Sequence, residues 1–363
     1  MRVMDFTRST PRLVVDLDWS PAYELLISLA AFASTDIQAT FDSGQEVFEE
    51  LRTRLSSELT AALGRLGPEG GKQWGTVMGL VWEDRLREPS DLIERIEGMP
   101  GNEFALILLG SRWPTLRAAV PPPLFVQASQ GDHEALDQLA TLTRQVEPEV
   151  KDATARIGVL KKLGPEATKL AFVDALRRWN DDVFSRQRPE VEPILRRDVE
   201  AKRALLGSVE PEKLIEAATH GLQYTASTWT RRVLLVPHVA MRPWNVMNAW
   251  DDVTIVCYPA DDEPSPADPT EPPARLVRLH KALGDEKRLR MLKVLAISGG
   301  ATLQELAGAT GLAKSSAHHH TVILRSAGLL NVTLEDNSRY TLRRDAVPEM
   351  SGWLEDFLEG GGR

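Results

Sequence analysis

Three adjacent histidines, His318 to His320, are the most distinctive chemical feature of the chain, within the stretch GLAKSSAHHHTVILRSAGLL at 311–330. They are three of its seven histidines. Imidazoles bind metals, carry protons near neutral pH and form hydrogen bonds. Successive residues of a helix point about 100° apart, so three adjacent histidines fan out, whereas a helical metal pair needs a spacing of three or four residues. The spacing therefore argues against a metal site.

A pair of helices must position this histidine run. Thr302 is a candidate N-cap for a short helix, and Glu305 three residues later completes a capping box. A glycine-bearing turn then leads into a longer helix, which we expect to run from Lys314 to Ala327 and to end at Gly328. Two helices joined by such a turn are typical of a helix-turn-helix.

Flanking segments complete this predicted domain. Residues 275–297 contain two apolar-periodic segments that break at Gly284, and Asp285 is a natural N-cap for the second one. Residues 329–344 (LLNVTLEDNSRYTLRR) alternate apolar and polar side chains around the sequence EDNS. This alternation predicts a β-hairpin, the wing of a winged helix.

Charge is distributed unevenly along the sequence. The whole chain has a net charge of −9, yet residues 274–345 contain twelve Lys and Arg against six Asp and Glu, a net charge of +6. A basic block inside an acidic chain is typical of nucleic-acid binding that is confined to one domain.

A proline-rich acidic segment separates the basic block from the rest of the chain. Residues 259–273 (PADDEPSPADPTEPP) contain six prolines and five acidic residues, a composition that cannot bury surface and favours an extended linker. We therefore predict a mostly helical sensor or regulatory domain at 1–258, the linker at 259–273, and a winged helix-turn-helix with a C-terminal helix at 274–363.

The N-terminal part is predicted to be mainly α-helical with a small antiparallel sheet. Ser20 and Pro21 mark the start of one helix, and residues 165–206 predict long helices interrupted near Pro189 and Pro193. Eight of the nine tryptophans precede the linker, where they could fill a helical core or line a ligand pocket. Three β-branched stretches predict strands, at residues 12–19, 231–239 and 252–259.

Composition also bears on location. The single cysteine, Cys257, cannot form an intramolecular disulfide. No apolar run reaches the roughly 18 residues of a membrane span, and the first residues lack the apolar stretch of a signal peptide. We expect a cytoplasmic protein without a membrane partner.

Residues 275–345 resemble the ArsR-type winged-helix repressors of bacteria, in ALGDEKRLRMLKVLA, TLQELAGATGLAKSSAHHHTVILRSAGLL and the hairpin end RYTLRR. The resemblance covers roughly a fifth of the chain. It implies a repressor that binds double-stranded DNA as a homodimer on a palindromic site. Residues 275–283 and 346–359 are the expected interface candidates, although the N-terminal domain could contribute.

The resemblance also bears on metals. Metal-sensing members place cysteines just before the first helix of the helix-turn-helix, where this chain has Thr302 and Gln304. Other members use histidine and carboxylate ligands on the last helix, and the matching segment here contains no histidine. We predict neither a metal nor another cofactor.

Helical phase assigns the surface of the predicted recognition helix. If Ala317 points inward, Thr321, Leu324 and Gly328 complete a packed stripe, Val322 faces away, and His320 borders the stripe as a half-buried residue. Ser and His side chains can bind bases or phosphates, whereas Lys and Arg suit phosphates. His318 and His319 could instead belong to a solvated face. The predicted DNA contacts are Thr302, Lys314, Ser315, Ser316, His318, His319, Arg325 and, at the tip of the wing, Arg339.

Together these features predict a DNA-binding transcription regulator rather than an enzyme. The N-terminal domain would sense an unknown small-molecule effector or set the geometry of the dimer. The main alternative is an enzyme of unknown activity fused to a DNA-binding module. The sequence contains no HExxH, GxSxG or CxxC motif, which argues against this alternative. A winged helix that binds protein is a third possibility, and the basic recognition face without an apolar patch argues against it.

Overall fold

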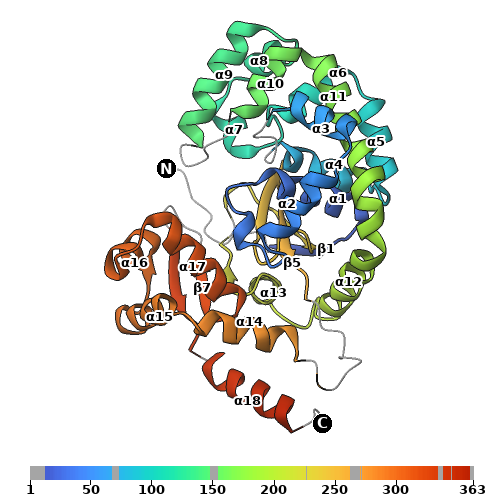
Figure 1. Ribbon diagram of the computed structural model, residues 1–363. Helices are drawn as coiled ribbons and strands as arrows, with labels where there is room; N and C mark the ends of the chain where they lie inside the picture. The colour runs from blue at the N-terminus through green and yellow to red at the C-terminus, as the bar shows by residue number, and fades with distance from the viewer. Residues whose placement is uncertain are drawn as a thin grey trace, which may run out of the picture.

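The computed structural model describes residues 13–67, 73–147, 154–225, 227–261, 270, 272–333, 338–344 and 346–359. Helices enclose a four-stranded sheet in a large N-terminal body, and a smaller C-terminal unit packs against this body (Figure 1). The mainly helical class with small sheets, predicted from the sequence, is confirmed. Within the described ranges, no helix is both long and apolar enough to cross a membrane.

The sheet of the N-terminal body has the strand order β1-β3-β5-β4. The three strands predicted from the sequence, β1, β3 and β5, pair in parallel rather than antiparallel, and the antiparallel neighbour is β4. Parallel pairing needs long crossovers, which the helices between β1 and β3 supply. The strands are β1 Val14–Leu17, β3 Arg232–His238, β4 Val246–Trp250 and β5 Val253–Pro259.

Helices fill the chain between β1 and β3. The first begins as predicted, because the Ser20 hydroxyl caps it by accepting a hydrogen bond from the Ala22 amide at 3.1 Å. The α-helices are α1 Pro21–Ala33, α2 Gln45–Arg54, α3 Ser57–Arg65, α4 Met78–Glu83, α5 Pro89–Glu97, α6 Gly101–Leu108, α7 Pro114–Ala119, α8 Pro122–Ser129, α9 His133–Val146, α10 Ala155–Leu163, α11 Pro165–Trp179, α12 Ser185–Arg203 and α13 Pro211–Ala218. Short 3₁₀ turns occupy Gln38–Thr40 and Trp74–Val77.

The break between α11 and α12 differs from the prediction. The helix was expected to be interrupted near Pro189 and Pro193, but α12 continues through both prolines. A π-helical turn at Asn180–Phe184 instead marks the join. Ser185 and Pro189 are both exposed, so water can satisfy the carbonyl that Pro189 leaves without a donor.

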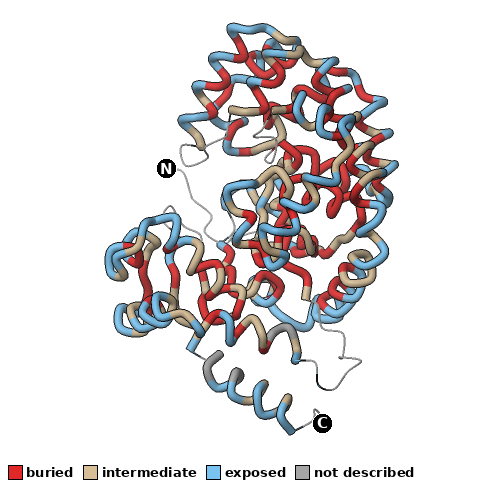
Figure 2. Tube along the Cα trace, in the orientation of Figure 1, coloured by how far each residue is buried: buried red, intermediate tan, exposed pale blue. Residues whose placement is uncertain are grey.

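Alternate residues of the sheet belong to two different hydrophobic cores. Leu234 and Val236 of β3 pack in the core that the N-terminal helices form around α1 and α11. Val233 and Leu235 point the other way, into a core shared by α12, α13 and the C-terminal unit. Figure 2 shows buried chain on both sides of the junction. The C-terminal unit is therefore packed onto one face of the sheet through continuous apolar contact.

The C-terminal unit has the predicted winged-helix elements. Asp285 caps α15 by accepting a hydrogen bond from the Arg288 amide at 3.0 Å, and Thr302 and Glu305 form the predicted capping box at α16. Most of the predicted EDNS turn lies outside the described residues. The elements are α14 Ala274–Leu283, α15 Glu286–Ser298, β6 Ala301–Thr302, α16 Leu303–Thr310, α17 Lys314–Ser326, β7 Leu330–Thr333, β8 Arg339–Leu342 and α18 Ala346–Leu358.

One strand of the wing sheet comes from the N-terminal body. β2 (Leu222–Gln223) follows α13 and pairs in parallel with β7, which gives the sheet order β2-β7-β8-β6. The Gly221 carbonyl accepts a hydrogen bond from the Val332 amide at 2.8 Å. Gly221 has φ +99°, and a Cβ there would lie 2.5 Å from the Leu330 carbonyl oxygen, so glycine is needed at this approach.

The predicted division into domains stays a prediction. Residues 262–269 and 271 of the predicted linker lie outside the described residues. The described residues on either side of the linker share both a sheet and a core.

Candidate nucleic-acid interface

The residues of α17 that were predicted to face inward are mostly buried, as expected. Ala317, Thr321 and Leu324 are all fully buried. Val322, which was expected to face away, is 5 % exposed. The reason is that α14, α15, α16 and β7 all contact α17, so the buried face is wider than a single stripe.

The exposed face of α17 lies at its N-terminal end. Lys314, Ser315 and Ser316 are exposed there, and His318 is exposed on one side while its ring contacts Trp244 of the N-terminal body on the other. A helix N-terminus carries unpaired amides and a partial positive charge, which favour an anionic partner. Hydroxyl, ammonium and imidazole groups can add hydrogen bonds to phosphates or base edges. This surface is called the recognition face below.

His319 and His320 turn towards the start of α15 and are half-buried. Their ring centroids lie 5.7 Å apart, and the Nδ1 atom of each is buried without a hydrogen-bond partner in the described structure. Burial lowers the pKa of both rings, while Asp285 raises it in part. No group of three or more His, Cys, Asp or Glu residues with metal-site geometry occurs among the described residues.

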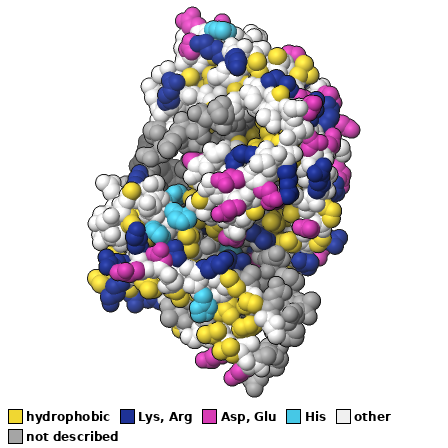
Figure 3. Space-filling model, in the orientation of Figure 1, with side chains coloured by type: hydrophobic (Ala, Val, Ile, Leu, Met, Phe, Trp, Pro, Cys, Tyr) yellow, Lys and Arg dark blue, Asp and Glu magenta, His cyan; other side chains and the backbone are white. Residues whose placement is uncertain are grey.

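His318 contacts the N-terminal body. Its ring meets that of Trp244 edge-on, with the centroids 5.1 Å apart. Burial, followed by the positive charges of Arg325 and Lys314, lowers the pKa of His318 below its ordinary value. Figure 3 shows histidine side chains at the junction of the two parts, beside Lys and Arg side chains of the C-terminal unit.

The segment that carries Trp244 is held firmly in place. The Trp244 indole donates a hydrogen bond to the Thr40 hydroxyl at 2.7 Å. The Glu24 carboxylate accepts hydrogen bonds from the amides of Val239 and Ala240. Burial raises the pKa of Glu24 to about 7, although these two amides oppose the shift. Trp244 is thus a fixed part of the body against which the recognition helix packs.

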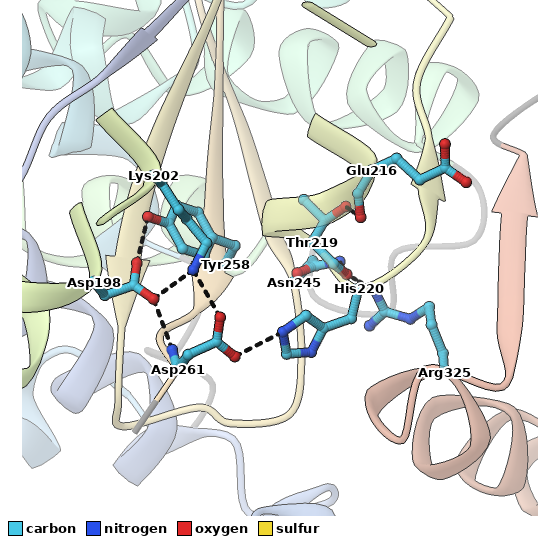
Figure 4. A network of polar contacts seen from close by, with 9 residues as sticks. All are labelled: Asp198, Lys202, Glu216, Thr219, His220, Asn245, Tyr258, Asp261 and Arg325. Atoms are coloured by element: carbon cyan, nitrogen blue, oxygen red, sulfur yellow. Dashed lines mark hydrogen bonds and ion pairs between the residues drawn. The ribbon is translucent and has the colours of Figure 1, made fainter. Parts of the chain in front are cut away.

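Arg325 is buried, contrary to its predicted role as a phosphate contact. The sequence predicts that it binds phosphate, yet it is 7 % exposed, and its Nη1 donates to the Thr219 carbonyl at 3.1 Å. The Asn245 amide donates to the same carbonyl at 3.0 Å (Figure 4). Burial lowers the pKa of Arg325 to about 10, so the side chain stays protonated at neutral pH. Arg325 lies too far along α17 to remain on the exposed end, and it joins the recognition helix to the body.

Arg339 and Thr302 have local partners. Arg339 is exposed at the start of β8, and its Nη2 donates to the Gly300 carbonyl at 2.9 Å rather than extending from the wing tip. Thr302 pairs with Arg339 across β6 and β8, and its hydroxyl caps α16 by accepting from the Glu305 amide at 3.2 Å. Both side chains are thus tied to nearby backbone, Thr302 at the start of α16 and Arg339 on β8, and their contact with DNA stays a prediction.

A polar network that is buried at Asp198 and partly exposed at Asp261 supports the junction from the side of the body (Figure 4). Asp198 on α12 accepts hydrogen bonds from the Tyr258 hydroxyl at 2.6 Å and from Lys202 at 2.5 Å. Lys202 also pairs with Asp261 at 2.9 Å, and Asp261 meets His220 at 3.0 Å. Burial opposes ionisation of Asp261, but His220 and Lys202 hold its pKa far below the ordinary range. The network fixes the residues immediately before β2.

The sequence did not predict that Trp244, Thr219 and β2 contact the C-terminal unit. Trp244 stood out only as one of eight tryptophans before the linker. β2 has two residues, which is too short for a periodicity of any kind. Contacts between distant parts of one chain leave no local pattern in the sequence.

Comparison with known proteins bears on the same region. A family model for the IclR helix-turn-helix domain matches residues 286–332, which extend from the start of α15 into β7. Neither the curated proteins nor the solved structures contain a significant match to the chain. The finding gives no support to the predicted ArsR family. It supports a helix-turn-helix transcription regulator whose DNA-binding domain, of the IclR type, lies at the C-terminus.

Proposed function

We propose that this protein is an effector-responsive transcription repressor, without enzymatic activity, that binds a palindromic operator as a homodimer. The observation that carries the DNA-binding part is the exposed N-terminal end of α17 inside the segment matched by the helix-turn-helix model. A recognition helix places its early residues at base edges in the major groove. Lys314, Ser315, Ser316 and His318 occupy those positions.

The C-terminal helix supports the proposed dimer. α18 packs on α14 at the edge of the molecule (Figure 1). Leu354 is 36 % exposed and Leu358 is 72 % exposed, although both are large and apolar. A second copy that covered these side chains would remove apolar surface from water. A dimer of this kind would carry two recognition helices, the number that the two half-sites of a palindromic operator require.

Three contacts support control of DNA binding by the N-terminal body. β2 pairs with β7, Arg325 binds the Thr219 carbonyl, and Trp244 meets the ring of His318. A change in the position of β2 or Trp244 would therefore act directly on the recognition helix. A ligand that binds the body in only one of two such arrangements would shift the affinity for DNA.

Salt dependence tests the DNA-binding role. Operator fragments selected from genomic DNA should bind the full-length chain with a slope of log K against log salt on the order of −4 to −8, at about −0.9 for each phosphate neutralised. Titrations by fluorescence anisotropy between low and moderate salt give this slope. A slope near zero would contradict binding through the basic C-terminal unit.

The pH dependence tests His318. Its pKa is lowered in the free protein by burial, Arg325 and Lys314, whereas nearby DNA phosphates would favour the protonated ring. A group that binds protons more tightly in the complex strengthens binding as pH falls, so operator affinity should rise below about pH 6.5, by up to roughly tenfold per pH unit for one proton. His318→Gln should remove most of this gain. The exposed His133 on α9 gives the matched control, His133→Gln, and equal slopes in the two variants would count against His318.

A further inference from the structure

We propose that a cavity of about 650 Å³ in the N-terminal body binds a small apolar carboxylate, whose carboxylate group pairs with Arg156. This inference deepens the proposed function by naming the chemical class of the effector. Its effect on DNA rests on that proposed function, but binding at the cavity does not.

The cavity has the size and lining of a small-molecule site. Its volume falls within the roughly 300–1,000 Å³ that is usual for ligand pockets. It lies between α1, the β4 strand and the segments that bear Trp113 and Arg156. Its apolar lining includes Ile27, Ala30, Ile37, Met78, Met241 and Val246. Such a surface favours a hydrocarbon body over a sugar or a peptide.

Arg156 on α10 is the unusual member of this lining. It is 4 % exposed, and its guanidinium carbon lies 4.5 Å from the centre of the Trp113 ring. Its Nε and Nη2 atoms are buried and have no hydrogen-bond partner in the described part of the chain. Burial lowers the pKa of Arg156 to about 10, and Glu147 opposes this shift, so the group is still a cation at neutral pH.

Unpaired donors on a buried cation are costly, and stacking on Trp113 offsets only part of that cost. An anion with two acceptor oxygens could accept hydrogen bonds from the unpaired Nε and Nη2 atoms of Arg156. Arginine and carboxylate form such paired, charge-assisted hydrogen bonds. Arg156 is the one Lys, Arg or His among the described lining residues, and Glu147 also lines the cavity. Because the described lining has no second cation, a monoanion fits better than a phosphate dianion.

The cavity also touches the elements that hold the recognition helix. Tyr224, which directly follows Gln223 of β2, lines it. Met241 and Val246 line it on either side of Trp244 in the sequence. A ligand would therefore contact the segments that meet β7 and His318.

The test compares acids with their uncharged amides on the full-length chain. Octanoate and 4-phenylbutyrate are the acid probes, and octanamide and 4-phenylbutyramide are their counterparts, with affinities measured by isothermal titration calorimetry. We expect each acid to bind roughly tenfold to a hundredfold more tightly than its amide. Arg156→Met should reduce the affinity for the acid to that for the amide. Arg144→Met, at an exposed arginine on α9, should leave both affinities unchanged.

Equal binding of acid and amide to the wild-type chain would overturn the proposal without any variant, even if Arg156→Met fails to fold. Absence of binding by all four probes at millimolar concentration would overturn it too. Operator titrations with and without saturating acid form a separate arm. Acid binding that leaves DNA affinity unchanged supports the site and contradicts its regulatory use, whereas failure to bind any DNA contradicts the proposed function and leaves the acid site standing.

Discussion

Replacing Ser316 with glutamate should lower the operator affinity of the full-length chain by about a hundredfold, or roughly 3 kcal/mol, without loss of stability. Ser316 is exposed in the first turn of α17, where the proposed complex brings phosphates and base edges close. A carboxylate there repels DNA and removes a small donor. The same carboxylate interacts favourably with the helix dipole, so folding should be unaffected or slightly favoured.

Anisotropy titrations with operator DNA, beside thermal melting curves, measure the two effects independently. Ser90→Glu provides the matched control, since Ser90 is an exposed serine in the first turn of α5, outside both the proposed dimer interface and the segment matched by the helix-turn-helix model. It introduces the same charge into the same chain. Equal losses of affinity in the two variants would mean that net charge, and not the recognition face, governs binding.

Asp198→Ala should lower the free energy of unfolding by about 3–5 kcal/mol, as expected when one partner of a buried ion pair is removed. The Asp198 side chain is fully buried and accepts from Lys202, from the Tyr258 hydroxyl and from the Asp261 amide. Alanine would leave a buried ammonium beside unpaired donors. Asp198→Asn keeps an acceptor and should cost less.

Urea denaturation followed by circular dichroism gives these free energies. Asp137→Ala is the control, because Asp137 pairs with Lys161 on the surface and such pairs contribute at most about 1 kcal/mol. If Asp198→Ala cost no more than Asp137→Ala, the network in Figure 4 would not hold the junction together.

Local signals in the sequence predicted local structure well. The capping residues Ser20, Asp285 and Thr302 start helices as expected, because a cap depends on residues only two or three positions away. The packed stripe of α17 also followed from helical spacing.

Features that depend on distant partners were not predictable in the same way. β1, β3 and β5 were recognised as strands, but their alternation does not encode whether neighbours run parallel. Arg325 was assigned to DNA from its charge and position, whereas its partner is a carbonyl 106 residues earlier in the chain. The unpaired guanidinium of Arg156 likewise depends on the burial that the fold imposes.

The shared strand at β2 sets a limit on how this regulator can be recombined with others. A hybrid protein made by cutting at the proline-rich segment would carry β7 without its neighbour Leu222–Gln223. An open strand edge is a template for pairing with other chains and promotes aggregation. A graft that is meant to keep the DNA-reading unit intact must therefore bring residues 219–223 along, or replace them with another strand.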